Sequence, residues 1–497
     1  MFEKIKMFFR KGGAVLNTGE SLSKVTDHPR IAMPESEYNR IVRNKQFYMQ
    51  KFDPIEYLDS NGDCCTRQRK SINVSKIVAR KLAKLVFNEG CEITVADNDD
   101  NEFLQSVFKD NKFRKNFCEE LEAGYAISGL VLRPYVDTGT NKVKIAYCHA
   151  DSFFPLHSNT NDVSEAAITT MTQVVEGKTT VYYTLLEFHL WEGGKYYIEN
   201  ELYRSTKNDE VGKRVPLDSL DVYKDLEPRS LMKGFTRPIF VYIKLAGKNN
   251  AELGSPLGSG VIDNARPQLE DINEKYDQFM WEIKKSSTKI IASDQFFKSN
   301  YDDNGRPTKH FASTTDVFQK LKTEDPFIDT FAPELRATEF INSINFILRI
   351  IEVLTGLSAG TFSFDGQSVK TATEIISENS ETYSTRSDNV LIVEEAMKEL
   401  VTTIFELAAA YGLHRPSTKI EASVDFDDGV FTSKEAQLDY NLKAVGGLMM
   451  PSAVAIQRQF GLSKEESKKW LMMIREEQLF MDPAELEQKS YQDEYGE

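Results

Sequence analysis

The stretch from Arg336 to Gly412 has the strongest helical periodicity in the chain. Its first part places apolar side chains three and four residues apart, which is the spacing of one helical face. They are Phe340, Ile344, Ile347, Leu348, Ile351 and Leu354. Gly356 then interrupts the pattern, as a residue that readily takes positive φ often does at a helix end. We therefore expect a helix followed by a loop, Leu357 to Lys370, with two glycines.

A second and much longer helix is predicted after this loop. Thr371-Ala-Thr-Glu374 is a capping-box pattern, in which Thr and Glu satisfy free backbone N–H groups. Helical spacing then continues to Gly412, and roughly 40 residues at 1.5 Å each make a helix about 60 Å long. Its middle, Ser377 to Asn389, is almost wholly polar. We expect this polar centre to face other chains or a water-filled space.

The charge of the chain argues against tight binding of nucleic acid. The formal net charge is −15 over 497 residues, whereas proteins that hold phosphates firmly are normally basic. An acidic surface that DNA passes without sticking remains compatible with this charge. The five cysteines form no Cys-x-x-Cys pair, which argues against a zinc ribbon or a disulfide framework. No apolar run is long enough for a membrane span, so none is expected.

The first half of the chain is predicted to combine helices with antiparallel strands. Residues up to about Lys45 show no clear pattern and are expected to be loosely packed. Amphipathic helices are predicted from Asn73 to Asn88 and from Asn101 to Gly124, with a short strand from Cys91 to Val95 between them. The helical period changes to a period of two at about Leu130.

The period of two predicts one antiparallel meander. Its expected strands are Leu130–Val136, Val143–Tyr147, Ile168–Val175, Thr179–His189 and Lys195–Leu202. Glycines in Glu176-Gly-Lys178 and Glu192-Gly-Gly194 predict hairpin turns. Residues Arg204 to Glu227 are expected to be a polar connection, and a further strand is predicted from Ile239 to Leu245.

A glycine-containing segment, Asn249 to Gly260, precedes the next helix. It could be compared with a phosphate-binding loop, but it lacks the Gly-Lys-Ser/Thr ending, so we expect a linker. From Ile262 to Ile283 apolar residues alternate in gaps of three and four, like a heptad seam. Pro267 is expected in the first turn, where its missing N–H is harmless. Residues Ser286 to Pro333 are predicted to form a small inserted α/β module.

The C-terminal part is predicted to be mostly helical. A strand is expected from Ile420 to Phe426, followed by a turn at Asp427-Asp-Gly429. Three helices are expected within 432–447, 451–460 and 463–480, each bounded by glycine, proline or a capping pattern. The acidic residues 482–497 are expected to be disordered.

No assembled catalytic or metal-binding motif is recognisable. His149-Ala-Asp151 could supply two metal ligands, but a third is not identifiable, and a strand end explains the pair better. Asp63 precedes Cys64-Cys65, yet nothing marks these thiols as activated. The sequence contains no Gly-x-Ser-x-Gly elbow and no His-Glu-x-x-His motif. This absence argues against an enzyme.

The order of the predicted parts, together with several short segments, carries a family resemblance. The segments are Arg69-Lys-Ser-Ile-Asn73, Thr355-Gly-Leu-Ser358, Lys370-Thr-Ala-Thr-Glu374, Phe426-Asp-Asp428, Gly446-Gly-Leu448 and Met450-Pro-Ser452. Over about residues 40–480 the chain resembles the portal proteins of tailed bacteriophages, most closely the siphophage type from Gram-positive hosts.

The resemblance implies an α+β, portal-like fold that is mainly helical. It would have long stem and tunnel helices, an antiparallel β-rich wing and a small α/β clip. The implied parts are an N-terminal wing (1–260), stem helices (261–285 and 334–356), the clip (286–333), a tunnel loop (357–370), a long kinked helix with the rest of the wing (371–449), and a crown with an acidic tail (450–497).

The resemblance also implies a function without catalysis, cofactor or metal. The chain would form a homo-oligomeric ring, usually of twelve copies, at one capsid vertex of the virion. Double-stranded DNA would pass through it during packaging and ejection, with weak and non-specific contacts. The implied partners are the terminase large subunit, the head–tail connector or adaptor, the scaffold and the major capsid protein, with assembly in the host cytoplasm and no membrane contact.

Two sets of site residues follow from the resemblance. The DNA-facing tunnel loop would present Thr361, Phe362, Ser363, Phe364, Asp365, Gln367, Ser368 and Lys370. The partner-binding clip would present Asp325, Phe327 and Asp329. We hypothesise that the uncharged polar residues and the single base of the loop touch phosphate weakly.

Two other classes of function are considered beside the portal. One is a different phage structural protein, such as a minor head protein, which would be monomeric or irregular in copy number. The other is an unrecognised enzyme, which would have a pocket with clustered, perturbed side chains.

Overall fold

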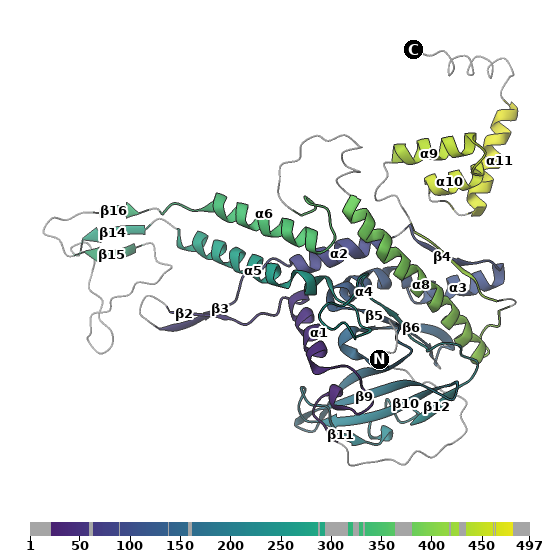
Figure 1. Cartoon of the computed structure of the whole chain (residues 1–497), viewed down its shortest axis with the longest axis horizontal. Helices are drawn as coiled ribbons and strands as arrows, with labels where there is room; N and C mark the ends of the chain where they lie inside the picture. The colour runs from purple at the N-terminus through teal and green to yellow at the C-terminus, as the bar shows by residue number, and fades with distance from the viewer. Residues whose placement is uncertain are drawn as a thin grey trace, which may run out of the picture. The chain divides into compact units, whose positions relative to one another are not determined.

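The computed structural model describes residues 21–480 apart from 59–62, 89, 138, 158–161, 287–288, 294–316, 322–327, 332, 363–379, 417–418, 427–433, 461 and 463. The chain divides into two compact units. The larger unit comprises Met1–Phe87 and Ile93–Val424, and the smaller unit comprises Asn88–Glu92 and Asp425–Glu497. Helices and antiparallel sheets make up the fold, so the predicted α+β class is confirmed (Figure 1).

The helices of the described residues lie close to most of the predicted positions. They are α1 (Glu35–Tyr48), α2 (Val74–Val86), α3 (Asn98–Asp110), α4 (Phe113–Ile127), α5 (Val261–Lys285), α6 (Ala337–Leu354), α8 (Ser380–Ala410), α9 (Lys434–Gly446), α10 (Ser452–Phe460) and α11 (Lys464–Phe480). The predictions for α2, for α6 and for the three C-terminal helices are confirmed.

The strands of the described residues form several separate sheets. They are β1 (Ser21–Leu22), β2 (Ile55–Leu58), β3 (Cys64–Arg67), β4 (Glu92–Val95), β5 (Leu130–Asp137), β6 (Lys142–His149), β7 (Phe153–His157), β8 (Glu165–Glu176), β9 (Thr179–Glu192), β10 (Lys195–Ser205), β11 (Gly212–Val215), β12 (Arg229–Met232), β13 (Val241–Ile243), β14 (Lys289–Ser293), β15 (Val317–Leu321), β16 (Ile328–Phe331) and β17 (Ala422–Asp425).

The predicted meander is divided between two sheets. Strands β8, β9 and β10 form the expected hairpins in a seven-stranded antiparallel sheet, ordered β1-β11-β10-β9-β8-β7 with β12 also paired to β10. Gly177 and Gly193 take positive φ in the two hairpin turns. Strands β5 and β6 pair with each other, and β5 also pairs with β13, in a separate sheet. The prediction of a single meander is therefore wrong. Strand β5 has β13, which comes much later in the chain, as its second neighbour, and a local pattern cannot reveal such a pairing.

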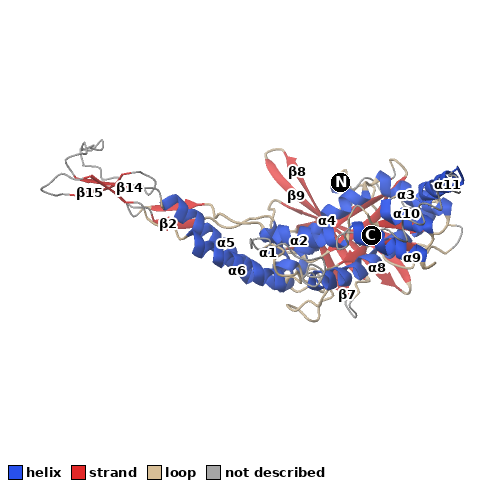
Figure 2. Cartoon of the chain, turned by 90° about the horizontal axis from the view of Figure 1, so that it is seen from above, coloured by secondary structure: helices blue, strands red, loops and turns tan. Residues whose placement is uncertain are grey.

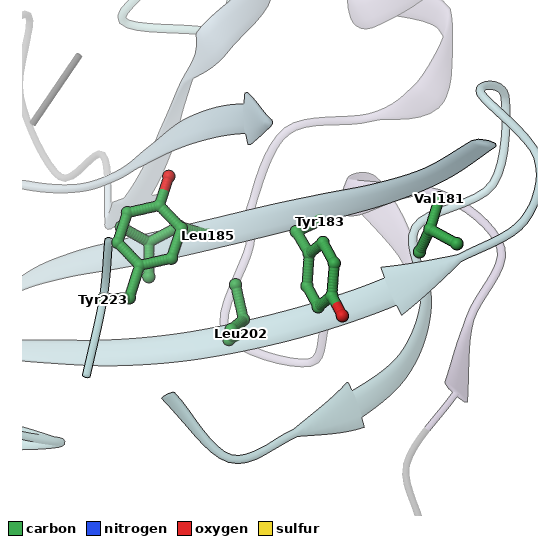
Figure 3. Close-up of a cluster of buried hydrophobic side chains, with 5 residues drawn as sticks. All are labelled: Val181, Tyr183, Leu185, Leu202 and Tyr223. Carbon is green, nitrogen blue, oxygen red and sulfur yellow. The ribbon is translucent and has the colours of Figure 1, made fainter. Parts of the chain in front are cut away.

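A cluster of five buried side chains packs around strands β9 and β10 of the larger sheet (Figure 3). Val181, Tyr183 and Leu185 alternate along β9 and therefore point to the same side. Leu202 of β10 and Tyr223 pack with them. Tyr223 belongs to the segment 204–227, which also contains β11. This segment supplies a side chain to the core, so the prediction of a merely polar connection is wrong.

The helix predicted from Asn101 to Gly124 is in fact two helices. Lys112 takes a left-handed conformation with φ of 47° and separates α3 from α4. The side chain of Asn111 explains the break, because its amide donates to the carbonyl oxygens of Val107 (2.8 Å) and Val143 (3.0 Å). Its oxygen accepts the N–H of Ile145 at 3.0 Å. Asn111 thus attaches the end of α3 to β6.

Helix α1 corrects the prediction that the first 45 residues are loosely packed. Its buried face carries Glu37, Arg40 and Asn44. The Arg40 guanidinium donates to Glu37 Oε1 at 3.0 Å, to Ser128 Oγ at 3.1 Å and to the carboxylate of Asp263. Three of the five buried residues of α1 are polar, so its buried face shows only a weak hydrophobic period, which is why the sequence pattern missed it.

Pro267 lies further inside helix α5 than the sequence predicts. Its first residue is Val261, and the carboxylate of Asp263 accepts the N–H of Gly260 at 2.8 Å. Pro267 is therefore the seventh helical residue, and the first-turn prediction is wrong. The prediction of a linker before α5 is confirmed: a Cβ on Gly260 would lie 2.5 Å from the Ala126 carbonyl oxygen, so this glycine permits close packing.

Helices α5 and α6 lie side by side (Figure 2). The rings of Phe279 and Phe340 stack with centroids 5.1 Å apart. Arg336 donates to Glu282 Oε2 at 2.5 Å just before α6 begins. The predicted seam of α5 is buried at Ile262, Ala265, Leu269 and Ile272. The sheet of β14, β15 and β16 lies between α5 and α6 in sequence.

Candidate functional site at the loop between α6 and α8

The end of α6 is fixed by a glycine, as predicted. Gly356 has φ of +69°, which an L side chain adopts only with strain. A Cβ at this position would lie 2.3 Å from Thr385 Oγ1 of α8. The N–H of Leu357 donates to the Glu352 carbonyl oxygen at 2.8 Å and closes the last turn. The glycine therefore ends α6 and lets the following loop start directly against α8.

A buried carboxylate organises the first residues of the loop. Glu352 is fully buried near the end of α6. Its Oε2 accepts the N–H of Gly360 at 2.8 Å, and its Oε1 accepts the N–H of Phe362. Hydrogen bonds to an ionised acceptor are among the stronger ones in proteins. Glu352 therefore fixes the path of residues 360–362.

Two hydroxyl residues join the loop start to α8. The N–H of Ser358 donates to Thr382 Oγ1 at 2.8 Å, and the N–H of Thr382 donates to Ser358 Oγ at 3.2 Å. The two hydroxyls lie 3.0 Å apart, and both residues are buried. We call Glu352, Ser358 and Thr382 the loop base. Because of the loop base, residue 362 is held close to the beginning of the described part of α8.

One face of the polar part of α8 is held by its own chain. Arg386 is buried and donates from Nε to the Leu85 carbonyl oxygen at the end of α2 (2.8 Å). Asn389 is buried and accepts the N–H of Ala246 at 2.9 Å. The prediction that this polar centre faces other chains or water is therefore wrong for Thr382, Arg386 and Asn389. The prediction stands for Glu381, Tyr383, Ser384 and Asp388, which are exposed.

The structure describes only the first of the predicted loop residues. Thr361 is half-buried and donates its hydroxyl to the Ser358 carbonyl oxygen at 2.6 Å. Phe362 is half-buried beside it. The hydroxyl proton of Thr361 is thus used within the chain. The other predicted residues lie outside the described part: Ser363, Phe364, Asp365, Gln367, Ser368 and Lys370, as does the predicted cap at Thr371.

The predicted clip contains a mixed three-stranded sheet. Strand β14 pairs in parallel with β15 and antiparallel with β16. Asp329 lies on β16 opposite Ile291 and is exposed. Asp325, Phe327 and residues 294–316 lie outside the described part. Strand β15 was not predicted from the sequence.

A cluster of titratable side chains lies in the core between two sheets. Arg133 of β5 donates to both carboxylate oxygens of Glu187 on β9 at 2.6 Å. His189 Nε2 lies 2.9 Å from Glu187 Oε1, and its Nδ1 contacts the hydroxyl of Tyr196. All four residues are buried. Burial opposes ionisation of Glu187, but the Arg133 guanidinium outweighs it and lowers the pKa of this carboxyl to about 2.

This buried cluster is suited to joining the sheets. Burial lowers the pKa of His189 although Glu187 acts in the opposite direction, so the imidazole is neutral at pH 7. Burial raises the pKa of Tyr196, whose oxygen also accepts the N–H of Ile239 at 2.9 Å. Each polar group is engaged by a neighbour inside the fold. The perturbed pKa values therefore have a structural explanation.

His149 and Asp151, the two residues considered as possible metal ligands, each bond to a different partner. His149 Nε2 lies 2.8 Å from Glu120 Oε2, and Asp151 accepts from Lys45 Nζ at 2.6 Å. They line a surface pocket of 280 Å³ with Cys148. Burial raises the pKa of the Cys148 thiol to about 11, which keeps it neutral and weakly nucleophilic. His149 ends β6, so the prediction of a strand end is confirmed.

Neither a metal-binding cluster nor a helix able to cross a membrane is present in the part of the chain that the structure describes. There, no group of three or more His, Cys, Asp or Glu side chains is placed to hold a metal ion. None of the described helices is both long and apolar enough to cross a membrane.

The sequence matches a known family over nearly its whole length. Residues 27–479 match the family described as "Phage portal protein, SPP1 Gp6-like". No curated protein sequence matches the chain.

Solved structures of gene transfer agent (GTA) particles contain similar chains. A chain from the neck of an empty GTA particle, computed with C6 symmetry, is 13% identical with a TM-score of 0.40, over 78% of this chain and 90% of that chain. A chain from the neck of a native GTA particle, computed with C12 symmetry, is 11% identical with a TM-score of 0.38, over 83% and 97%. A chain from the native GTA virion is 12% identical with a TM-score of 0.37, over 78% and 88%.

Proposed function

The chain belongs to the SPP1 Gp6-like family of phage portal proteins, and from this membership we propose how its parts act in a portal. About twelve copies form a closed ring at one vertex of the capsid. Double-stranded DNA passes through the centre during packaging and ejection. The family is structural, so the energy for packaging comes from a separate ATPase. We assign the virus to the siphophages of Gram-positive hosts, with assembly in the host cytoplasm.

The loop from Leu357 to Lys370 is proposed to meet the passing DNA. The observation that supports this role most directly is the loop base. Glu352 holds the backbone at Gly360 and Phe362, and Ser358 is joined to Thr382. A contact with moving DNA would pull on the loop, and this attachment transmits the pull to α6 and α8. The phosphate contacts are assigned to the residues after Phe362, including Gln367, Ser368 and Lys370.

The charge of the chain supports weak contact rather than binding. Each lysine or arginine that neutralises a phosphate adds salt-dependent affinity, which would slow transport. The net charge of −15 works against such affinity. Lys370 is the only basic residue between Leu357 and Lys370. The loop would thus touch DNA without holding it.

DNA contact can be tested by photo-crosslinking in filled particles. A photoreactive amino acid at Gln367 should become attached to the packaged DNA. The same amino acid at Leu253, an exposed residue of the linker before α5, is the matched control and should give no more than background. Equal crosslinking at the two positions, or none at Gln367, would contradict the assignment of the loop.

The sheet of β14, β15 and β16 is proposed as the docking surface for the terminase large subunit and later for the head–tail connector. Stem roles are proposed for α5 and α6, a wing role for residues 1–260, and a crown role for residues 450–497. The scaffold and the major capsid protein are proposed to contact the ring at the vertex. Charged residues on such a docking surface favour partners that carry the opposite charge, and they thereby set partner choice.

Reversing the charge at Asp329 should weaken terminase or connector binding without unfolding the ring. Asp329 is exposed on β16, opposite Ile291 of β14. We expect a loss of roughly 1 kcal/mol, or about fivefold in affinity, as for a charge at the edge of an interface. Binding of purified rings to each partner measures it, with Asp218→Lys as a surface control. Unchanged binding to both partners would count against the clip assignment.

A further inference from the structure

A pocket of 620 Å³ opens in the larger unit between the last turns of α3, the turn that joins β5 to β6, and the residues that follow α8. Ligand pockets in proteins usually measure about 300–1,000 Å³, so this space can hold a large side chain of a partner. The proposed function gives it no role. We call it the α3 pocket, and the residues that matter here are Phe103, Val107, Lys109, Lys142, Val143 and Leu413.

Four apolar side chains line the α3 pocket. Val107 of α3 and Val143 of β6 are buried, and Leu413 is half-buried. Phe103 of α3 adds an aromatic ring, which stacks on the imidazole of His414 with centroids 4.5 Å apart. Such a lining favours an apolar or aromatic side chain of a ligand, because water is then released from both surfaces.

The walls of the α3 pocket are attached to one another. The Asn111 side chain joins the end of α3 to β6 through the carbonyl oxygen of Val143 and the N–H of Ile145. His414 Nε2 lies 2.6 Å from Asp100 Oδ1, which joins the segment after α8 to the start of α3. The pocket is therefore formed before a ligand arrives, and a preformed site loses less conformational entropy on binding.

Basic residues gather beside the α3 pocket. Residues 109–115 and 139–144 together carry six basic residues and one acidic residue, although the whole chain has a net charge of −15. Lys109 and Lys142 line the pocket itself and are exposed. The one acidic residue, Asp110, accepts from Lys142 Nζ at 2.6 Å and offsets only one of the six positive charges. The rim of the pocket is therefore positive.

The environment of Asp110 shows that these charges lie close together. The hydrogen bond from Lys142 lowers the pKa of Asp110, and the charges of Lys144 and Lys109 act in the same direction. Like charges that are held close to one another repel. A negatively charged ligand would relieve this repulsion, so the charge of the rim is complementary to an acidic partner.

The combination of an apolar pocket with a basic rim indicates a protein ligand. Nucleic acid is held mainly through its phosphates, and such contacts need a basic surface but no apolar pocket. Protein partners are anchored by a large apolar or aromatic side chain in a pocket, while charged residues around it select the partner. The ligand that fits is therefore an acidic peptide segment that carries one such side chain.

We propose that the α3 pocket binds an acidic segment of a partner protein. One aromatic or large aliphatic side chain of that segment enters the pocket, and its carboxylates pair with Lys109 and Lys142. This inference goes beyond the proposed function, because it requires neither the ring nor DNA. It adds a site for a protein partner at residues other than those of the loop and the clip.

Binding of a synthetic peptide to the purified full chain tests the proposal. The probe is a fluorescein-labelled peptide in which glutamates flank one tryptophan, and fluorescence anisotropy measures its dissociation constant. We expect saturable binding. Lys109→Gln combined with Lys142→Gln should weaken it about fivefold, because two charge contacts with the ligand are lost. The matched control, Lys178→Gln combined with Lys195→Gln, removes the same charge from two exposed hairpin positions and should leave the affinity unchanged.

Two further comparisons test the pocket rather than its rim. Replacing the tryptophan of the probe by alanine leaves the protein unaltered and removes only the apolar anchor, so binding should weaken about tenfold or more. Ser106 is exposed on α3 and also lines the pocket. Ser106→Trp would fill the space and should weaken binding of the original probe to a similar degree, with circular dichroism to check that the variant is folded.

Several results would overturn the proposal. If the probe does not bind, the pocket takes no ligand of this class. If the alanine probe binds equally well, or if the lysine control loses the same affinity, the attraction is one of charge alone. If duplex DNA of mixed sequence displaces the probe, the surface takes nucleic acid instead. If a chain without residues 482–497 binds the probe more tightly, the ligand is the acidic end of this chain and not a separate partner.

Discussion

Replacing Arg133 by methionine should lower the free energy of unfolding by about 3–5 kcal/mol, the usual cost of leaving a buried charge without its partner. Arg133 on β5 is bonded to both carboxylate oxygens of Glu187 on β9. Strands β5 and β9 belong to different sheets, so this pair joins the two sheets through the core. Urea unfolding followed by circular dichroism measures the change.

The control for this prediction removes both charges. Arg133→Met combined with Glu187→Met should recover most of the lost stability, because apolar side chains of similar size fill the space. If the double variant is as unstable as the single variant, the loss comes from packing and not from the orphaned carboxylate. If the single variant is as stable as the unmodified chain, the pair does not hold the sheets together.

The pH dependence of the same variant has a definite sign. The pKa of Glu187 in the folded protein is lowered to about 2, below its ordinary value near 4.5. Its ionisation therefore contributes stability above about pH 4.5, and this contribution is lost as the pH falls towards 2. In Arg133→Met the buried carboxyl favours its neutral form. The stability difference between the two proteins should narrow as the pH falls through this range.

Replacing residues 361–368 by a Gly-Ser linker of equal length should leave the ring intact and reduce packaged or retained DNA about tenfold. The loop base, Glu352, Ser358 and Thr382, remains in place. The N–H at position 362, which donates to Glu352, then belongs to a linker residue. The proposed DNA contacts after Phe362 are lost. A tenfold change corresponds to about 1.4 kcal/mol of weakened retention.

Nuclease-protected DNA in particles assembled with the linker variant measures this effect. The matched control replaces the exposed turn at residues 206–210 between β10 and β11 by Gly-Ser. Particles with the control should package normally. Normal packaging by the 361–368 variant would show that this loop is only a connection between two helices. A loss of rings in that variant would show that the loop contributes to assembly instead.

Periodic apolar faces explain why much of the fold could be predicted. In α2 and α6 the buried residues are the apolar ones at three- and four-residue spacing, so their positions followed from the pattern. The hairpins between β8, β9 and β10 followed from alternation and from glycines at their turns. Gly356 and Gly412 end their helices with positive φ, as expected from residues without a Cβ.

The errors fall where polar side chains decide the structure. Helix α1 was missed because its buried face carries Glu37, Arg40 and Asn44. The break between α3 and α4 depends on what Asn111 bonds to on β6. Arg386 interrupts the apolar spacing of α8, yet it is buried and bonded to the Leu85 carbonyl oxygen. These interactions join residues far apart in sequence, so no local pattern reveals them.

The candidate site shows the same limit. Thr355-Gly-Leu-Ser358 was noted for its resemblance, and Gly356 was correctly assigned to the helix end. Glu352 was overlooked because it lies among the apolar residues of α6, where a carboxylate reads as a solvent-facing position. An acidic residue one turn before a helix-ending glycine is a sequence signal that could have identified it, since free N–H groups of a following loop attract a carboxylate.

The central claim is that this chain forms a portal ring, and native mass combined with negative-stain images tests it most directly. Twelve copies of the 56.6 kDa chain would give a closed ring of about 680 kDa with a central hole. Rings of this kind, with one uniform copy number, are the predicted result. A homogeneous monomer, both alone and after co-expression with the capsid proteins of its own phage, would contradict the account.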